Sequence, residues 1–492
     1  MTRRWIVIGT LLVLALLLRP VFHGVIMTFV VHPLEFVALG LVLYGAWRIR
    51  GQFQSLRLVS MSSGYYELKG DRLTWRAVSL YVVLLLTLGT GLGLESEFRL
   101  ARTARTIEYT VRDHLPVFTP LRLTPKPVAE RYAADTFQNP QEHLGDSQIV
   151  LVDGRLKRVF PRLPDGIILT LLKKLTGFVL VDVDTLDRTV SIEDQPFQIA
   201  EGIGIFDNLY YQLPLKRFLV DYSSEPIYLK DDQGQWITVV PYIRYRGFPF
   251  TVPEWGGVMI VHADGSMEDL TPVQAANRSD LAGNRLYPKE LTHFYSASYA
   301  YRGGIINKWF LHRNETEIVS LEGEESIIHV PTDEGFKQLV VAEPYGRSYG
   351  IYRIFVFDAS SGKREILEFD QNSQLTGPVA AADYIRKEFP SYDWSAFLLA
   401  EPRPVVHGQD LGWLFSVVPA DAAGIATMAV LDAKTNQVFQ AKTATDLMRI
   451  LAGASLPSEE GLPKSGDSIV TEVQQRIETI QRELNALKEL VK

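Results

Sequence analysis

Three ionisable residues stand in or beside long apolar runs near the N-terminus, where a charge is costly. Arg19 follows the first apolar run, and His32 and Glu35 interrupt the second. His32 and Glu35 are three residues apart, so one face of a helix would carry both. Charged groups inside a membrane usually face protein or water. Arg19, His32 and Glu35 would therefore either lock helices together or form a path for ions or protons.

An acidic strand end offers a second candidate for chemistry. In FVLVDVDTLDRT (178–189), the residues Asp182, Asp184 and Asp187 follow an apolar run. The segment resembles the phosphatase motif D-x-D-x-T but is one residue short, and no matching lysine or acidic motif follows. The oxygens could bind Ca²⁺, yet the glycine and the terminal glutamate of an EF-hand loop are missing. We expect ordinary turn chemistry here.

Other catalytic and cofactor patterns are missing from the sequence. The chain of 492 residues has no cysteine, which excludes disulfides, thiolate metal sites and cysteine nucleophiles. Its nine histidines form no H-E-x-x-H, and neither G-x-S-x-G nor a phosphate-binding loop occurs. We predict no catalytic residue, cofactor or metal, although distant residues could still form a composite site. The net charge of -7 argues against binding to nucleic acid.

Repeated phrases indicate building blocks. LVVAEP (339–344) and FLLAEP (397–402) are nearly identical, and a third Glu-Pro pair occurs at 225–226. Asp264, Asp358 and Asp432 each begin a similar hairpin turn, where an aspartate caps backbone N–H groups. The unit reads as helix, strand, strand and Asp-turn hairpin, and we expect it two or three times.

These hairpins resemble those of PepSY and cystatin-like domains, in which a helix packs on a curved antiparallel sheet. The resemblance covers about 60 residues per copy and fits 375–440 best. It implies extracytoplasmic interaction or regulatory modules rather than enzymes.

The apolar runs predict three N-terminal membrane spans, at about 5–22, 25–47 and 77–94. A cleaved signal peptide is the alternative for the first run. The 48–76 loop is rich in lysine and arginine, which places it and the N-terminus in the cytoplasm. Everything after residue 94 would then be extracytoplasmic. Gly89 and Gly93 have the spacing that lets membrane helices approach closely.

After the membrane region (1–94), the pattern changes along the chain. An apolar stripe on a charged helix predicts a helical stalk over 95–115. Alternating strands predict two α+β regions, at 145–335 and 336–455. A linker at 456–468 then leads to a heptad pattern over 469–492.

The C-terminal heptads predict an oligomer. The seam positions are apolar throughout, and they are Val470, Val473, Ile477, Ile480, Leu484, Leu487 and Val491. Isoleucine and leucine at both core positions favour three or more strands. The alternative is a single amphipathic helix that packs on its own domain.

The sequence thus predicts a membrane-anchored α+β protein of the cell membrane: multi-pass, with three spans, a stalk, repeated modules and a coiled coil. We expect a homo-oligomeric envelope scaffold that is structural and not an enzyme. Its partners would be membrane lipids, other copies of the chain and other envelope proteins. A subunit of a channel or transporter that uses Arg19, His32 and Glu35 is the main alternative, and an enzyme with a composite site is a weaker one.

Overall fold

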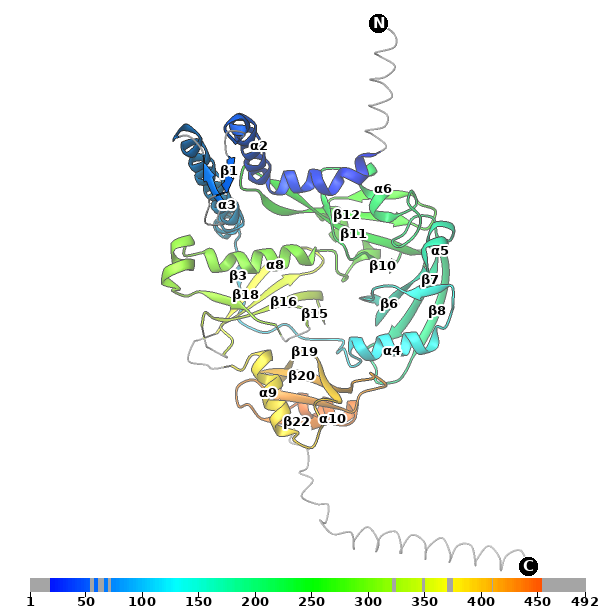
Figure 1. The fold of residues 1–492 in the computed structure, drawn as a ribbon. Helices are drawn as coiled ribbons and strands as arrows, with labels where there is room; N and C mark the ends of the chain where they lie inside the picture. Colours follow the sequence, from blue (N-terminus) through cyan, green and yellow to red (C-terminus); the bar gives the residue numbers. More distant parts are fainter. Residues whose placement is uncertain are drawn as a thin grey trace, which may run out of the picture.

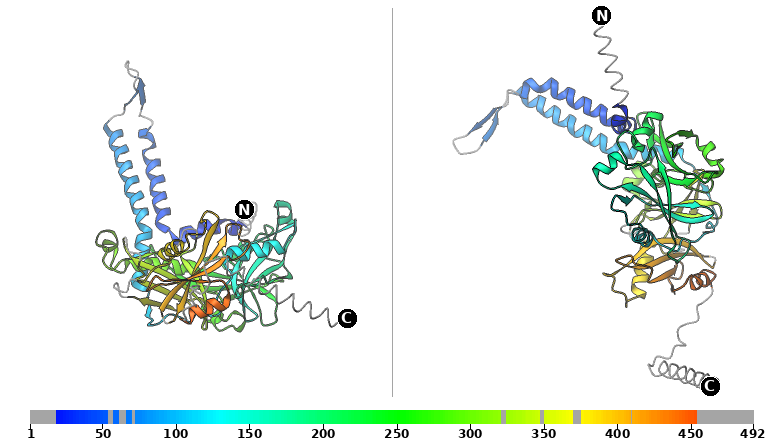
Figure 2. Two further views of the ribbon diagram at one scale, coloured as in Figure 1. Left: turned by 90° about the horizontal axis from the view of Figure 1, so that it is seen from below. Right: turned by 90° about the vertical axis from the view of Figure 1, so that its right-hand side faces the viewer.

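The computed structural model describes residues 18–53, 57–60, 66–69, 72–320, 324–346, 350–369, 375–408 and 410–453. A long helical hairpin stands on a body built from four antiparallel sheets (Figures 1 and 2). The expected linker (456–468) and coiled coil (469–492), with all seven seam residues, lie outside the described residues.

The body repeats one unit four times, in which a helix precedes an antiparallel sheet. In chain order the units begin with α4 (Lys126–Thr136), α6 (Leu209–Lys216), α8 (Lys289–Ser298) and α9 (Pro378–Glu388). We call them the first to fourth units. From the sequence we expected this unit two or three times. The structure contains more copies, and insertions of uneven length obscure the repeat in the sequence.

Apart from one edge strand of the third sheet, the strands follow chain order along the main path of each sheet. The first sheet contains β4 (Glu142–Leu144), β5 (Gln148–Val152), β6 (Arg155–Pro164), β7 (Leu175–Asp182) and β8 (Val190–Phe197). The second contains β9 (Asp221–Tyr222), β10 (Ile227–Lys230), β11 (Trp236–Arg246), β12 (Val252–His262) and β13 (Met267–Leu270). Short helices α5 (Ile167–Leu172) and α7 (Pro272–Ala276) and the 3₁₀ turn η1 (Ser279–Leu281) lie in the connections.

The other two units have the same order. The third sheet contains β14 (Thr316–Ile318), β15 (Ile327–Thr332), β16 (Gly335–Pro344), β17 (Arg353–Asp358), β18 (Arg364–Glu368) and the parallel edge strand β3 (Thr110–Val111). The fourth contains β19 (Phe397–His407), β20 (Asp410–Pro419), β21 (Thr427–Asp432) and β22 (Val438–Ala441), followed by α10 (Ala444–Leu451). The border that we expected at 335/336 falls inside β16, between two residues that pair with β15.

Apolar side chains hold each helix on its sheet. Ala381, Ala382 and Ile385 of α9 are buried against Trp413 and Phe415 of β20. Leu209 and Leu213 of α6 pack in the same way on the second sheet. One large cluster contains residues of the first, second and third sheets, so these units share a core.

The aspartate turns have the chemistry that the sequence predicts. The Asp264 carboxylate accepts a hydrogen bond from the N–H of Ser266 at 2.9 Å. Asp358 and Asp432 each accept from two backbone N–H groups in the same position. These aspartates therefore cap turns, and the repeat is a building block.

The hairpin consists of α2 (Pro33–Phe53) and α3 (Arg72–Thr106), with the two-stranded β1 (Arg57–Ser60) and β2 (Tyr66–Lys69) at its tip. The helices meet where Gly45 faces Tyr81, because a Cβ atom at Gly45 would lie 3.1 Å from the tyrosine ring. The Tyr81 hydroxyl donates a hydrogen bond to the Val42 carbonyl at 3.3 Å. The hairpin projects far beyond the sheets (Figure 2).

The prediction of three N-terminal spans is wrong. Only Val78–Thr106 of α3 is long and apolar enough, as a continuous helix of the described residues, to cross a membrane. The expected span at 25–47 is broken, because the helices Leu18–Val31 and Pro33–Trp47 meet at 94°. Pro33 lacks the N–H that would continue the first helix and restricts the residue before it. Of the expected span at 5–22, residues 5–17 lie outside the described residues.

The expected stalk at 95–115 is also wrong. The helix does continue from the apolar part of α3, but it ends at Thr106. Its last turns are packed on the body, where Ala101 and Ala104 are buried against Ala300 and Tyr301. Residues after 106 are extended and include β3, so the segment joins the third sheet instead of projecting.

Candidate functional site

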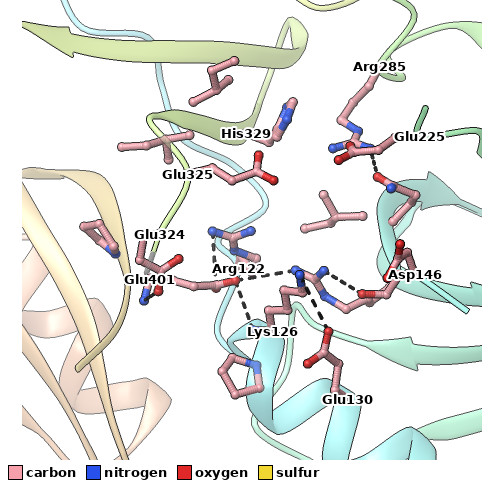
Figure 3. A pocket seen from close by; sticks show the side chains of 18 residues that line it. Arg122, Lys126, Glu130, Asp146, Glu225, Arg285, Glu324, Glu325, His329 and Glu401 are labelled. Carbon is pink, nitrogen blue, oxygen red and sulfur yellow. Dashed lines mark hydrogen bonds and ion pairs between the residues drawn. The ribbon is translucent and has the colours of Figure 1, made fainter. Parts of the chain in front are cut away.

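A charged cavity lies at the centre of the body, where all four units meet. Its volume is about 540 Å³. The segment before α4 and the strands β5 and β6 form one wall, and the residues before β10 and α8 form another (Figure 3). The segment at 324–329 and the strand β19 complete it. No single unit contains the site, so it exists only in the assembled body.

Glu401 of the repeated AEP phrase is the anionic centre of this cavity. A β-bulge in β19 gives Glu401 a positive φ of 48°, a strained conformation that is enriched at functional sites. Its carboxylate accepts a hydrogen bond from the N–H of Lys126, at the start of α4, at 3.1 Å. Arg122 lies 3.4 Å and Arg158 lies 3.6 Å from its oxygens. Although burial opposes ionisation, Arg122, Arg158 and Arg403 hold the pKa of Glu401 below its usual value.

Buried arginines outnumber buried carboxylates on the cavity wall. Arg122, Arg158 and Arg285 are 9%, 5% and 6% exposed, and Glu401 is the buried carboxylate among the lining residues. Arg158 also donates to the Ser147 hydroxyl at 3.1 Å. Arg403 lies behind the wall, where it donates to the carbonyls of Arg122 and Leu123. The buried part of the wall therefore has a surplus of positive charge, whereas the more exposed part of the lining is acidic.

Arg285 is compensated less directly than Arg122 and Arg158, because Glu225 acts on its pKa without forming an ion pair. Its guanidinium donates to the side chain of Gln148, and it has no ion-pair partner in the part of the chain that the structure describes. Burial lowers the pKa of Arg285 to about 10, and this still leaves it charged at neutral pH. Burial, with Arg285 next in importance, also lowers the pKa of His329 well below its usual value, so this imidazole is neutral.

The remaining acidic side chains are more exposed than Glu401, and several have partners. Glu225 and Glu325 both pair with Lys289, which comes from α8. Glu130 pairs with Lys126 at 3.8 Å. Glu324 accepts a hydrogen bond from the N–H of Glu401 at 3.0 Å, and burial raises its pKa. These groups are placed around the buried arginines (Figure 3).

Two of the three Glu-Pro pairs that the sequence singled out reach this cavity. Glu225 and Glu401 line it, whereas Glu343 of the other AEP phrase does not. Glu343 lies opposite Glu317 on the strand pair β16–β14. Burial and then Glu317 raise the pKa of Glu343 to about 7. The glutamates of the repeated Glu-Pro motif therefore lie in different environments.

The predicted intramembrane polar residues separate into two places. His32 and Glu35 lie at the base of the hairpin, with ligand atoms of His32, Glu35 and Glu95 within 4.8 Å of one another. Arg99 joins them, because its guanidinium lies 3.3 Å from His32 Nε2. These residues could hold a metal ion by geometry, but the cationic Arg99 opposes it.

Arg19 does not join that cluster. Its guanidinium donates to the Leu215 carbonyl and lies 5.5 Å from the centre of the Phe218 ring. It therefore fastens the helix Leu18–Val31 to the body. Along a helix, 13 residues correspond to about 20 Å, so Arg19 and His32 lie far apart.

The remaining residues that the sequence singled out lie neither in the cavity nor in the His32 cluster. A Cβ atom added at Gly89 or Gly93 would meet nothing within 4 Å, so both glycines face open space in the single chain. Asp182 and Asp184 form ion pairs with Arg155 at 2.6 and 2.8 Å. Lys157 lies 3.7 Å from Asp182 as well, so two basic side chains face these two carboxylates.

An apolar surface surrounds the hairpin. The helix Leu18–Val31 lies across the side of the body from which the hairpin rises (Figure 2). Its inner face is tied down, for example by the 2.9 Å contact between His23 Nε2 and the Val220 carbonyl. Its outer face exposes Leu18, Val21, Phe22, Val25 and Phe29 at helical spacing. The helix α5 also buries none of its residues.

Exposed apolar residues continue at the foot of α3. The rings of Phe98 on α3 and Phe250 are in tilted contact, with their centres 5.2 Å apart. The π-helix η3 (Asn307–Leu311) is anchored there by a hydrogen bond of 3.2 Å from the Trp309 indole to Glu97. Phe310 on this helix is 72% exposed. We use the name apolar face for the exposed apolar side chains of the helix Leu18–Val31 together with Phe98 and Phe310.

Sequence reasoning missed both the cavity and the apolar face. The cavity arginines stand singly in unrelated segments, and only the repeated Glu-Pro pairs pointed toward it. The helix Leu18–Val31 of the apolar face was assigned to parts of two predicted membrane spans, because hydropathy alone does not show the bend that follows it. In comparisons with protein-family models and with curated proteins, no match to this chain was found.

Proposed function

We propose that the protein is a membrane-anchored scaffold that holds its four-unit body against the bilayer surface. The observation that carries this proposal is the apolar hairpin that rises from an apolar face. Large exposed apolar side chains occur along both helices, including Val37, Leu43, Leu80 and Val83. Surfaces of this size are rare on proteins that stay in water and mark contact with a membrane or another protein.

The dimensions of the hairpin fit a bilayer. The 21 residues of α2 correspond to about 30 Å, the thickness of the hydrocarbon core. The α3 window is only 6% buried within the chain, so lipid can surround it. We propose that α3 crosses the membrane with α2 packed beside it, which gives a two-helix anchor.

Charge suggests the orientation of this anchor. The segment from 48 to 76 contains Arg48, Arg50, Arg57, Lys69, Arg72 and Arg76. Such clusters stay in the cytoplasm. The tip of the hairpin would therefore be cytoplasmic and the body extracytoplasmic.

The helix Leu18–Val31 supports contact between body and bilayer. It lies at 94° to the following helix, so it would run along the membrane surface when the hairpin crosses the membrane. Its apolar outer face and anchored inner face are typical of an interfacial helix.

A scaffold role also needs copies or partners. The open faces of Gly89 and Gly93 could accept a second hairpin. The apolar heptads at 469–492 favour assembly of three or more chains. The four units resemble interaction modules, and other envelope proteins are the expected partners.

Single-cysteine labelling tests the anchor directly, because the natural chain has no cysteine. Ser60→Cys, at the end of β1, reports on the tip and Gln233→Cys reports on the β10–β11 turn. With an impermeant maleimide on spheroplasts, we expect Gln233→Cys to react at once and Ser60→Cys only after lysis. Equal reactivity of both positions would contradict the orientation.

The contact between body and bilayer needs a separate measurement. A fluorophore at Val25→Cys should show blue-shifted emission and quenching by lipid-bound quenchers in nanodiscs. The same fluorophore at Gln233→Cys is the matched control and should stay in water. If Val25→Cys behaves like the control, the body does not lie on the bilayer.

Assembly is tested by native mass spectrometry after gentle detergent extraction. We expect a homo-oligomer of three or more chains. Deletion of 469–492 should lower the copy number while the body stays folded. A monomeric wild-type protein would contradict the scaffold.

A further inference from the structure

We propose that the central cavity binds a small organic anion, whose carboxylate or phosphate group is held by Arg122, Arg158 and Arg285. This site goes beyond the proposed scaffold and does not depend on the membrane anchor. It would give the body a ligand that bridges its units.

The first argument is charge. Three arginines and one carboxylate are buried in the wall, and the carboxylate of Glu401 is already shared between Arg122 and Arg158. Arg285 has no ion pair among the described residues. Buried charges are normally paired, since leaving one unpaired in a low-dielectric region is costly. An incoming anion would supply the missing charge.

The second argument is geometry. The three arginines come from different units or connections, and all of them line the same cavity. The Nε–H groups of Arg122, Arg158 and Arg285 are buried and have no hydrogen-bond partner. A guanidinium presents a planar fork of donors that matches carboxylate and phosphate oxygens. Unused donors on buried arginines are what an oxyanion site requires.

The third argument is the neutral histidine. His329 lines the same space, and its Nδ1 atom is buried without a partner. A neutral imidazole can donate or accept one hydrogen bond without adding charge. It could therefore contact an uncharged polar atom of the ligand beside the anionic group.

The cavity also bounds the size and the polarity of the ligand. About 540 Å³ is within the usual range for sites of small molecules. Glu130, Asp146 and Glu325 are exposed at the cavity. They disfavour a polyanion that extends outward, so a ligand with one or two anionic groups fits best.

Direct titration of the full-length protein in nanodiscs tests the proposal. The probes are inorganic phosphate, glycerol 3-phosphate, succinate and citrate, and glycerol is the uncharged control. Ionic strength is held constant during calorimetry and thermal unfolding. We expect saturable binding and a raised melting temperature with at least one anion, and the preferred probe distinguishes phosphates from carboxylates. Absence of saturable binding of all four anions up to tens of millimolar would overturn the proposal.

Variants then test the assignment of residues. Arg285→Gln should weaken binding of the preferred anion at least tenfold, and Arg285→Lys should weaken it less because the charge remains. Arg217→Gln is the matched control, since Arg217 pairs with Asp269 away from the cavity. Unchanged affinity in Arg285→Gln would overturn the site. If that variant does not fold, Arg285→Lys decides by the same criterion, with unchanged affinity counting against the site.

Discussion

The guanidinium of Arg158 on β6 lies 3.6 Å from the carboxylate of Glu401 on β19. This contact joins the first unit to the fourth across the central cavity. The same carboxylate accepts from the start of α4 and faces Arg122. One strained residue therefore contacts several segments that are far apart in the sequence.

Replacing Glu401 should destabilise the body strongly. In Glu401→Gln the arginines at 122 and 158 lose their shared counter-ion, and breaking a buried ion pair costs about 3–5 kcal/mol. Chemical denaturation measures the loss. Glu130→Gln is the control, because Glu130 is an exposed residue of the same cavity, and its change should stay within about 0.5 kcal/mol. Equal effects of both variants would contradict the special role of Glu401.

Glu343 should make stability depend on pH. Its pKa is raised to about 7 in the folded chain, so the folded protein keeps a proton that the unfolded chain releases. The free energy of unfolding therefore falls as pH rises from about 4.5 to 7. Glu343→Gln removes this loss and should be more stable than wild type at pH 8, by about 1–3 kcal/mol. Denaturation at pH 4 and pH 8 checks this, and an advantage at pH 4 alone would contradict it.

Two aspartate turns should respond differently to the same change. Asp264→Asn should have little effect, because asparagine caps such turns nearly as well. Asp358 also forms an ion pair of 2.6 Å with the nearly buried Lys337. Asp358→Asn should therefore cost more, about 1–3 kcal/mol. Thermal unfolding measures the loss of stability in both variants. A larger loss in Asp264→Asn than in Asp358→Asn would contradict this prediction.

The glycine face of α3 should matter for assembly and not for the single chain. Gly89→Ile with Gly93→Ile adds bulk where nothing lies within 4 Å, so the hairpin should still form. We expect a lower copy number by mass photometry in detergent. Gly91→Ile is the matched control on another face of the same helix. If Gly91→Ile lowers the copy number equally, the face at Gly89 and Gly93 is not the contact.

Local patterns could be read from the sequence alone. The turns at Asp264, Asp358 and Asp432 were predicted correctly, because an aspartate caps a turn through groups two or three residues away. The alternation of β-branched and aromatic residues predicted strands after residue 145, and sheets dominate there. The apolar part of α3 was also recognised. Each of these features depends on neighbours within one element.

The direction in which a helix runs, and the surface on which it packs, could not be predicted from the sequence. Hydropathy did not reveal the bend at His32 and Pro33, which divides a predicted span into a helix packed on the body and an arm of the hairpin. The prediction of a stalk was wrong for a similar reason. The apolar stripe of this helix packs on Tyr301 of the body. An apolar stripe shows that a face will be covered and does not say by what.

The sequence by itself determined the strands, the turns and the apolar helices, because their causes are local spacing and side-chain type. Only the tertiary structure decided that Glu401 and Glu225, but not Glu343, reach one cavity. It also decided that Arg122, Arg158 and Arg285 meet there. Charges far apart in the chain interact only after folding brings them within a few ångströms, and in a low-dielectric interior that distance controls their energy.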